Sequence, residues 1–323
     1  MPKPRVVITR KIPAAAEERA RSLFDVELNE NDTPLGAAGL ARAMREADGL
    51  LPCVADKITP DLLGMTGRRV KIVANYGVGY NNIDVVSAKE NGVVVTNTPD
   101  VLTEDTADLA LTLMLATARR VGEGERELRG GRWTGWRPTH MLATQVHGKT
   151  LGLIGIGRIG RAVARRAHLG FGMRIIYHDP YPLSEAETAA LAAERKESIE
   201  AVLRESDFVS LHCPATPETK HLMNASRFAQ MRKGSILINT ARGDVVNEGD
   251  LIAALRSGAI SGAGLDVFEK EPMVPAELTS MENVVLLPHL GSATTETRDA
   301  MGNIVLDGID AVLAGRTPTN LVT

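Results

Sequence analysis

The chain has 323 residues, 44% of them hydrophobic and 24% charged, which is the composition of an ordinary globular protein. A chain of this length exceeds the size at which one hydrophobic core keeps growing, so we expect two domains. The net charge of -3 and the aromatic content of 3% argue against a nucleic-acid partner or an anionic membrane surface. We expect a cytoplasmic protein without a secretory leader or membrane span. The two cysteines, Cys53 and Cys213, predict neither a metal site nor a disulfide framework.

Strand and helix patterns alternate through the first third of the chain. Short buried strands are expected at residues 5–9, 49–51, 71–75 and 93–96, and a helix at 14–23. Strands separated by helical patterns predict a parallel sheet with helices on both faces. After Pro99 the pattern changes to a long helix that begins near Thr103 or Asp105 and runs to Arg120. The aperiodic segment 130–138 contains both tryptophans and is expected to be a loop.

A second run of alternating strands and helices begins at Thr150. We expect its strands at residues 151–154, 174–178, 207–212, 235–239, 262–266 and 283–287, and a last helix at 295–314. The predicted fold class is α/β with two doubly wound parallel sheets: a Rossmann dinucleotide-binding domain, residues 100–289, inserted in a flavodoxin-like substrate-binding domain, residues 1–99 and 290–323. Linkers near Pro99 and Pro288 predict domains that close over a bound ligand.

The segment 151–160, LGLIGIGRIG, predicts a dinucleotide site. Gly155 and Gly157 allow a tight turn that approaches a ligand closely, and Gly160 allows close packing of helix on strand. The helix expected from Arg161 points its free N–H groups at a pyrophosphate. Asp179 follows the next strand, about 20 residues beyond the last glycine, where a carboxylate can bind a ribose diol.

Polar residues follow several other predicted strands, where ligands bind in open α/β sheets. Arg242 offers a planar fork for a carboxylate, and His289 beside a carboxylate such as Glu271 would be held as a charged acid. The turn at residues 76–79 can present backbone N–H groups to an anion. Together these groups are what the reduction of a 2-oxo acid requires. Taken singly, each also has a structural interpretation: a surface ion pair for Arg242, a packing role for His289 and a turn cap for Glu271.

Four motifs resemble the D-2-hydroxyacid dehydrogenase family, in its order and spacing over nearly the whole chain: residues 155–160, 239–246 (NTARGDVV), 262–267 with 271–272, and 288–292 (PHLGS). The resemblance implies that Arg242 binds and polarises the substrate, that His289 is the general acid, and that Glu271 orients and charges it. It also implies substrate-carboxylate contacts from the backbone of Val78 and Gly79.

The same resemblance implies a set of contacts to the dinucleotide beyond the three glycines. These contacts are expected from Thr106, Arg158, Ile159, Asp179, His212, Pro214, Thr219, Thr240, Ala241, Asp266 and Gly291, with Asp266 at the nicotinamide amide. NADP-using members have a basic residue after the second cofactor-domain strand, where this chain has Asp179-Pro180. We therefore expect NAD(H) to be preferred over NADP(H), unless Asp179 turns away and Arg158 receives the 2′-phosphate.

Within the family, segments 98–103, 131–138 and 242–247 look most like those of glyoxylate and hydroxypyruvate reductases. This implies reduction of glyoxylate to glycolate and of hydroxypyruvate to D-glycerate, in a homodimer whose Trp136 shapes the pocket of the neighbouring subunit. Two alternatives stay open: a dehydrogenase of another acid (2-ketogluconate, 3-phosphoglycerate or phosphite), and a non-enzymatic NAD-sensing scaffold. Val78 stands where phosphite-oxidising members have a lysine, and residues 80–82 add no basic group for a phosphorylated substrate.

Overall fold

The computed structural model describes residues 2–323, and the chain divides into two compact units. The first unit comprises Met1–Leu102 and Ser292–Thr323, and the second comprises Thr103–Gly291. Both boundaries lie slightly later in the chain than we predicted. The second unit begins with the long helix that starts at Thr103, and it ends at a turn whose Leu290 and Gly291 N–H groups bind Asp266.

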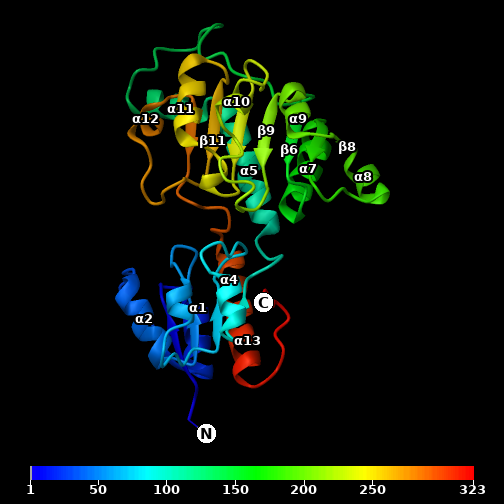
Figure 1. Ribbon diagram of the computed structural model, residues 1–323. Coiled ribbons are helices and arrows are strands. Elements are labelled where there is room, and N and C mark those ends of the chain that lie inside the picture. The colour runs from blue at the N-terminus through cyan, green and yellow to red at the C-terminus, as the bar shows by residue number, and fades with distance from the viewer. Residues whose placement is uncertain (1) are drawn as a thin grey trace. The chain divides into compact units, whose positions relative to one another are not determined.

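The first unit, drawn in blue to cyan and in red in Figure 1, is built on a five-stranded parallel sheet in the order β2-β1-β3-β4-β5. This is the flavodoxin-type doubly wound order. Its strands are β1 (Arg5–Ile8), β2 (Asp25–Glu27), β3 (Gly49–Leu51), β4 (Ile72–Ala74) and β5 (Val94–Thr96). Its helices are α1 (Ala14–Leu23), α2 (Gly36–Glu46), α3 (Pro60–Leu63), α4 (Val85–Glu90) and α13 (Thr295–Leu313). Helix α13 returns the end of the chain to this sheet, where it packs on β3, β4 and β5.

The second unit has a seven-stranded parallel sheet in the order β12-β11-β10-β9-β6-β7-β8. Its strands are β6 (Thr150–Ile154), β7 (Arg174–His178), β8 (Ala193–Arg195), β9 (Phe208–Leu211), β10 (Ile236–Asn239), β11 (Gly262–Leu265) and β12 (Val284–Leu286). Its α-helices are α5 (Thr103–Ala118), α6 (Val121–Arg129), α7 (Arg158–Phe171), α8 (Glu185–Leu191), α9 (Ile199–Glu205), α10 (Ala225–Phe228), α11 (Glu248–Ser257) and α12 (Ala276–Ser280). The strand order reverses at β6, so the Rossmann switch point lies between β6 and β9.

Side chains that alternate along these strands fill a core on each face of the larger sheet. Ile236 and Ile238 of β10 join the core beneath α5 and α7, whereas Leu237 between them joins the core beneath α9, α10 and α11. A strand buried on both faces reads as a continuous apolar run, which is why the central strands could be predicted from the sequence.

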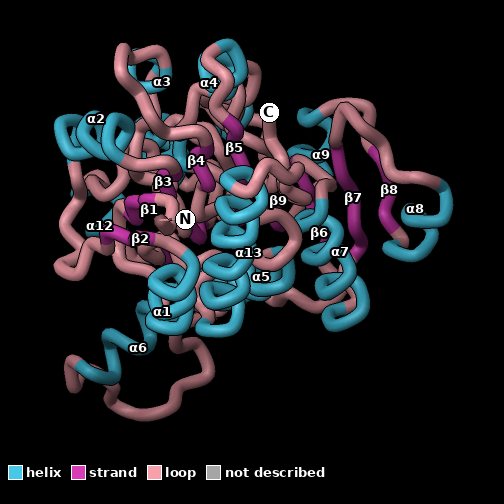
Figure 2. Tube along the Cα trace, turned by 90° about the horizontal axis from the view of Figure 1, so that it is seen from below, coloured by secondary structure: helices cyan, strands magenta, loops and turns pink. Residues whose placement is uncertain are grey.

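Two of the four edge strands, β2 and β8, were not predicted, because they are short and largely polar. Both strands carry charged residues, which discourage the edge of a sheet from pairing with another chain. These are Asp25 and Glu27 in β2, and Glu194 and Arg195 in β8. Two further corrections concern helices: α7 starts at Arg158 rather than at Arg161, and the unpredicted helix α6 follows α5. In the tube view, α6 and the loop after it extend away from the body of their own unit (Figure 2).

Within residues 2–323, no helix combines the length and apolar character needed to cross a membrane. The same residues contain no group of three or more histidine, cysteine, aspartate or glutamate side chains placed to hold a metal ion.

Candidate active site

The glycine turn between β6 and α7 has the geometry that a dinucleotide requires. Gly155 has φ +95°, and a Cβ there would lie 2.7 Å from the Cys213 nitrogen. A Cβ on Gly160 would lie 2.5 Å from the Gly155 carbonyl oxygen, so this glycine permits the close packing of helix on strand. A Cβ on Gly157, in contrast, would meet no atom within 4 Å, so the backbone there is open to a ligand. The turn leads directly into the 14-residue helix α7, whose first N–H groups suit a pyrophosphate.

Asp179 lies directly after β7 and is tied to the same turn. Its Oδ2 accepts a hydrogen bond of 2.8 Å from the Ile156 N–H, and its Oδ1 accepts one of 2.8 Å from the Tyr181 N–H. The carboxylate is therefore held beside the glycine turn and does not turn away. Each oxygen retains a lone pair with which it can accept a ribose hydroxyl.

Several other expected cofactor contacts lie at the carboxyl ends of the strands. His212 follows β9, and its Nε2 lies 2.8 Å from the Ser210 hydroxyl. Burial lowers the pKa of His212 to about 4, so its ring is neutral near pH 7. The Thr240 hydroxyl is buried and has no partner within residues 2–323. An unpartnered buried hydroxyl and an open glycine turn fit a dinucleotide lying along this edge.

Other expected contacts already bind their own chain. The Thr106 hydroxyl donates to the Gly291 carbonyl at 2.9 Å, and the Thr219 hydroxyl donates to the Pro214 carbonyl at 2.6 Å. The Ala241 N–H donates to the Asn239 side chain at 3.0 Å. Any contact that these groups make with a cofactor is additional to a bond within the chain. Arg158 and Ile159 form the first turn of α7.

Arg242 is positioned by the short loop after β10. The Asn239 side chain donates to the Arg242 carbonyl at 2.9 Å, and the guanidinium donates to the Ala241 carbonyl at 2.7 Å. Burial lowers the pKa of Arg242, and the charges of Glu271 and Asp244 oppose this shift. The group remains a cation, because arginine does not lose its proton in proteins.

Gly243 lets the Arg242 loop pack against the segment after β11. A Cβ on Gly243 would lie 1.9 Å from the Phe268 carbonyl carbon and 2.4 Å from the Glu269 nitrogen. No larger residue fits without moving one of the two backbones.

Glu271 and His289 form a direct pair. The His289 Nδ1 lies 2.8 Å from the Glu271 Oε2, while Oε1 accepts the Phe268 N–H at 3.1 Å. Burial alone would raise the pKa of Glu271, but the hydrogen bond and charge of His289 hold it below its ordinary value. The Glu271 carboxylate is thus held as an anion against the His289 Nδ1.

Asp266 holds the turn that carries His289. Its Oδ1 accepts the Leu290 N–H at 2.6 Å, its Oδ2 accepts the Gly291 N–H at 2.9 Å, and its carbonyl accepts the His289 N–H at 2.9 Å. Burial raises the pKa of Asp266, and the Leu290 N–H and the charge of His289 oppose the shift. His289 itself has φ +57°, in the left-handed region that residues other than glycine adopt uncommonly.

In the first unit, residues 77–79 after β4 form what we call the anion turn. The N–H groups of Val78 and Gly79 donate to no acceptor within residues 2–323. The carbonyl oxygens of the turn, in contrast, are all bound by donors of the same unit, among them Thr98 N–H and Asn97 Nδ2. Unpaired N–H groups in a glycine turn can accept an anion such as a carboxylate.

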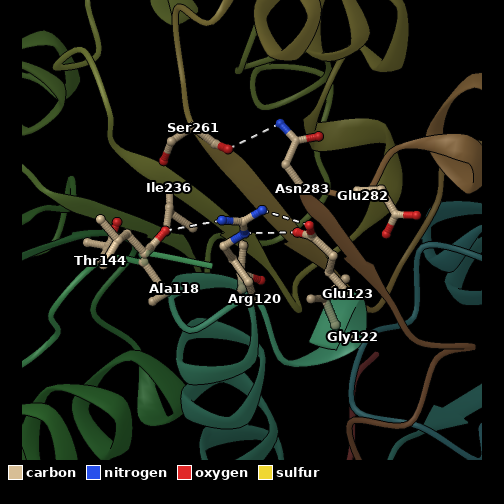
Figure 3. A pocket seen from close by; sticks show the side chains of 13 residues that line it. Ala118, Arg120, Gly122, Glu123, Thr144, Ile236, Ser261, Glu282 and Asn283 are labelled. Atoms are coloured by element: carbon tan, nitrogen blue, oxygen red, sulfur yellow. Dashed lines mark hydrogen bonds and ion pairs between the residues drawn. The ribbon is translucent and has the colours of Figure 1, made fainter. Parts of the chain in front are cut away.

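The loop after α6 carries exposed apolar side chains. Trp136 is 82% exposed and Trp133 52% exposed, and no residue of α6 is buried. Arg120 holds the start and the end of this segment together. Its guanidinium binds Glu123 (Figure 3) and donates to the Leu142 carbonyl at 3.2 Å.

The cavity drawn in Figure 3 lies at the amino ends of the strands, whereas Arg242, Glu271 and His289 follow the carboxyl ends. Its lining includes Ile236, Ser261 and Asn283, which lie at the amino ends of β10, β11 and β12, and its volume is about 580 Å³. Because ligands of open α/β sheets bind at the carboxyl ends of the strands, this cavity is not the site of the chemistry.

Comparison with known families agrees with this geometry. Residues 111–291 match the family model described as "D-isomer specific 2-hydroxyacid dehydrogenase, NAD binding domain". The chain belongs to this family. It is therefore an oxidoreductase, and the second unit is its NAD-binding domain.

Curated members of the family align along the whole chain. A glyoxylate reductase of Thermococcus litoralis is 45% identical over 99% of this chain and 97% of its own length. A glyoxylate reductase of Aeropyrum pernix is 46% identical over 100% of this chain and 96% of its own. Among solved structures, the NADPH-dependent glyoxylate/hydroxypyruvate reductase of Sinorhizobium meliloti, in complex with NADP and malonate, has a TM-score of 0.88 and 38% identity, covering 99% of this chain and 97% of its own.

Two residues that support the dehydrogenase site were not identified as such from the sequence. Asn239 holds both ends of the Arg242 loop, and Gly243 makes room for the 268–269 backbone. Both lie within the NTARG segment, but the sequence does not say which neighbour requires them.

Proposed function

We propose that the protein is an NAD(H)-dependent reductase of small 2-oxo acids that converts glyoxylate to glycolate and hydroxypyruvate to D-glycerate. The contact that carries this proposal is the 2.8 Å pair of His289 and Glu271, with the cation Arg242 near enough for its charge to act on Glu271. Whole-length similarity to enzymes named glyoxylate reductase supports the choice of substrate.

Each residue has a distinct role in the proposed reaction. The nicotinamide, when bound, supplies the hydride. Arg242 binds the substrate and polarises its ketone, and the His289 Nε2 donates the proton to the ketone oxygen. Glu271 stabilises the charged form of His289 before the transfer. In the other unit, the Val78 and Gly79 N–H groups bind the substrate carboxylate.

We also propose that NADH is preferred over NADPH. The Asp179 carboxylate is held beside the glycine turn by Ile156, where a 2′-phosphate would meet a like charge. Residues 180–182, Pro-Tyr-Pro, add no positive charge. The Sinorhizobium relative is NADPH-dependent, so the proposed preference of this chain differs from that of a similar protein.

We further propose a homodimer in which the loop after α6 lies against the partner subunit and Trp136 helps to shape its pocket. The 82% exposure of Trp136 and the absence of buried residues in α6 support an interaction surface there. Light scattering gives the oligomeric state. A monomeric protein that retains full activity would contradict this part of the proposal.

The deciding experiment measures kcat/KM for a panel of substrates, with the loss of absorbance of the reduced coenzyme as the readout. The panel contains glyoxylate, hydroxypyruvate, 2-ketogluconate and 3-phosphohydroxypyruvate, each with NADH and with NADPH. We expect the highest kcat/KM for glyoxylate or hydroxypyruvate with NADH. His289→Gln should reduce kcat by about two to four orders of magnitude and leave NADH binding intact.

His168→Gln is a control from the same unit, because His168 lies in the last turn of α7 and its Nδ1 lies 3.2 Å from the Met173 carbonyl oxygen. We expect its turnover to stay near that of the wild type. Normal turnover in His289→Gln would refute the assignment of the acid. NADH binding without turnover of any 2-oxo acid would instead favour a non-enzymatic sensor.

A further inference from the structure

The carbonyl oxygens of the anion turn are each held by a donor of the same unit. The Gly77 oxygen accepts the Thr98 N–H at 3.1 Å, and the Val78 oxygen accepts the Asn97 Nδ2 at 2.8 Å. The Gly79 oxygen accepts the Asn75 Nδ2 at 2.9 Å. Three consecutive carbonyl groups are thus fixed in direction by one backbone amide and two asparagine side chains.

Fixing these carbonyl groups also fixes the N–H groups between them. In a trans peptide the C=O of one residue and the N–H of the next share one plane and point in opposite directions. The bond from Asn97 to the Val78 oxygen therefore sets the direction of the Gly79 N–H. The Thr98 N–H does the same for the Val78 N–H through the Gly77 oxygen.

The Asn75 amide is itself oriented by a second buried asparagine. Its Oδ1 accepts the Asn82 Nδ2 at 3.1 Å, which leaves its own Nδ2 to face Gly79. The Asn82 Nδ2 also lies within 3.2 Å of the Cys53 and Asp56 carbonyl oxygens. Asn75 is 0% exposed and Asn82 5% exposed, so water does not compete for these bonds.

We propose that Asn75, Asn82 and Asn97 are positioning residues, which hold the anion turn so that the Val78 and Gly79 N–H groups are aimed at the substrate carboxylate before it binds. This inference rests on the proposed function. A turn whose donors are fixed in advance binds an anion without losing conformational freedom at that moment. Asn97 gives the sharpest test, because its side-chain bond acts on the peptide that supplies the Gly79 N–H.

The test substitutes Asn97→Asp in the full-length protein and measures three quantities. The new carboxylate oxygen would face the Val78 oxygen and would repel it instead of donating to it. We expect KM for glyoxylate and Kd for oxamate, a carboxylate probe added with NADH, to rise by about tenfold or more. We expect kcat to change by less than about twofold and Kd for NADH not to change, because Arg242 and His289 are untouched.

Two further variants separate positioning from general damage to the fold. Asn91→Asp makes the same chemical change in the same unit, where Asn91 Nδ2 donates to the Ser87 carbonyl at 2.8 Å, and it should keep the wild-type KM. Asn97→Ala removes the donor without adding charge and should raise KM and the oxamate Kd less than Asn97→Asp does.

The inference is overturned if the wild type binds oxamate and both Asn97 variants bind it equally well. It is also overturned if Asn97→Asp lowers kcat with KM unchanged, or if Asn91→Asp raises KM to the same extent. Absence of oxamate binding and of glyoxylate reduction in the wild type would overturn the proposed function and this inference with it.

Discussion

His212 should make the stability of the protein depend on pH in a defined window. Burial lowers the pKa of its ring from 6.5, the value expected in an unfolded chain, to about 4. Between these two values the unfolded chain binds a proton that the folded protein does not. The free energy of unfolding therefore falls as the pH decreases from 6.5 towards 4, and it stays level with respect to this group outside that window.

The size of the effect follows from the two pKa values. At about pH 5 the folded state is disfavoured by about 2 kcal/mol relative to about pH 7, and the full shift corresponds to a limit of about 3 kcal/mol. The His212→Gln variant, which can still bond the Ser210 hydroxyl, lacks the proton and should lack this slope. All other titratable groups are the same in the two proteins. The difference between their pH dependences of the free energy of unfolding therefore isolates His212.

Urea unfolding of both proteins, followed by circular dichroism across this pH range, measures that difference. We expect the wild type to lose about 2 kcal/mol more than His212→Gln between about pH 7 and pH 5. Parallel losses would show that His212 is protonated as readily in the folded protein as in the unfolded chain. The neutral ring that we place beside the dinucleotide would then be wrong.

Three further predictions concern the site directly. Gly243→Ala should lower kcat/KM by at least about tenfold, because its Cβ would overlap the Phe268 carbonyl carbon and displace the Arg242 loop. Steady-state kinetics would measure this loss, and the Kd for NADH should stay unchanged. We expect the wild type to prefer NADH by about tenfold or more, and Asp179→Ser should reduce this preference, mainly by weakening the binding of NADH. An equal kcat/KM for both coenzymes in the wild type would contradict the role of Asp179. Arg242→Lys should lose about two orders of magnitude in kcat/KM, because an ammonium cannot reproduce the planar fork; a change below about threefold would argue against a bidentate substrate contact.

The parts of the fold that could be predicted are those where one residue type is required locally. Gly155 is required by a positive φ and by the approach of the Cys213 nitrogen, so the turn has a recognisable spacing of glycines. Central strands such as β10 are apolar throughout because both faces are buried. Strand β2 has no such signature. It is a strand only because Asp25–Glu27 pair with β1. Three residues, of which two are charged, are too few to show a periodic pattern in the sequence.

The candidate site divides in the same way. The sequence places Arg242, Glu271 and His289 after three strands, and strand ends of a parallel sheet share one edge, so their proximity could be expected. What each oxygen and nitrogen binds could not be expected. Nothing in the spacing indicates that Glu271 uses one oxygen for His289 and the other for the Phe268 N–H.

Asp266 shows why this difference matters for mechanism. The family resemblance gives it a contact with the nicotinamide amide, which treats it as a cofactor ligand alone. In the structure its two carboxylate oxygens accept the N–H groups of Leu290 and Gly291, and its carbonyl accepts the N–H of His289. His289, with φ +57°, lies in the turn that these three bonds hold, so the direction of the imidazole depends on Asp266. Replacing Asp266 would therefore disturb the proton transfer that we propose for His289 even where cofactor binding survives. A loss of activity there would not by itself identify a nicotinamide contact.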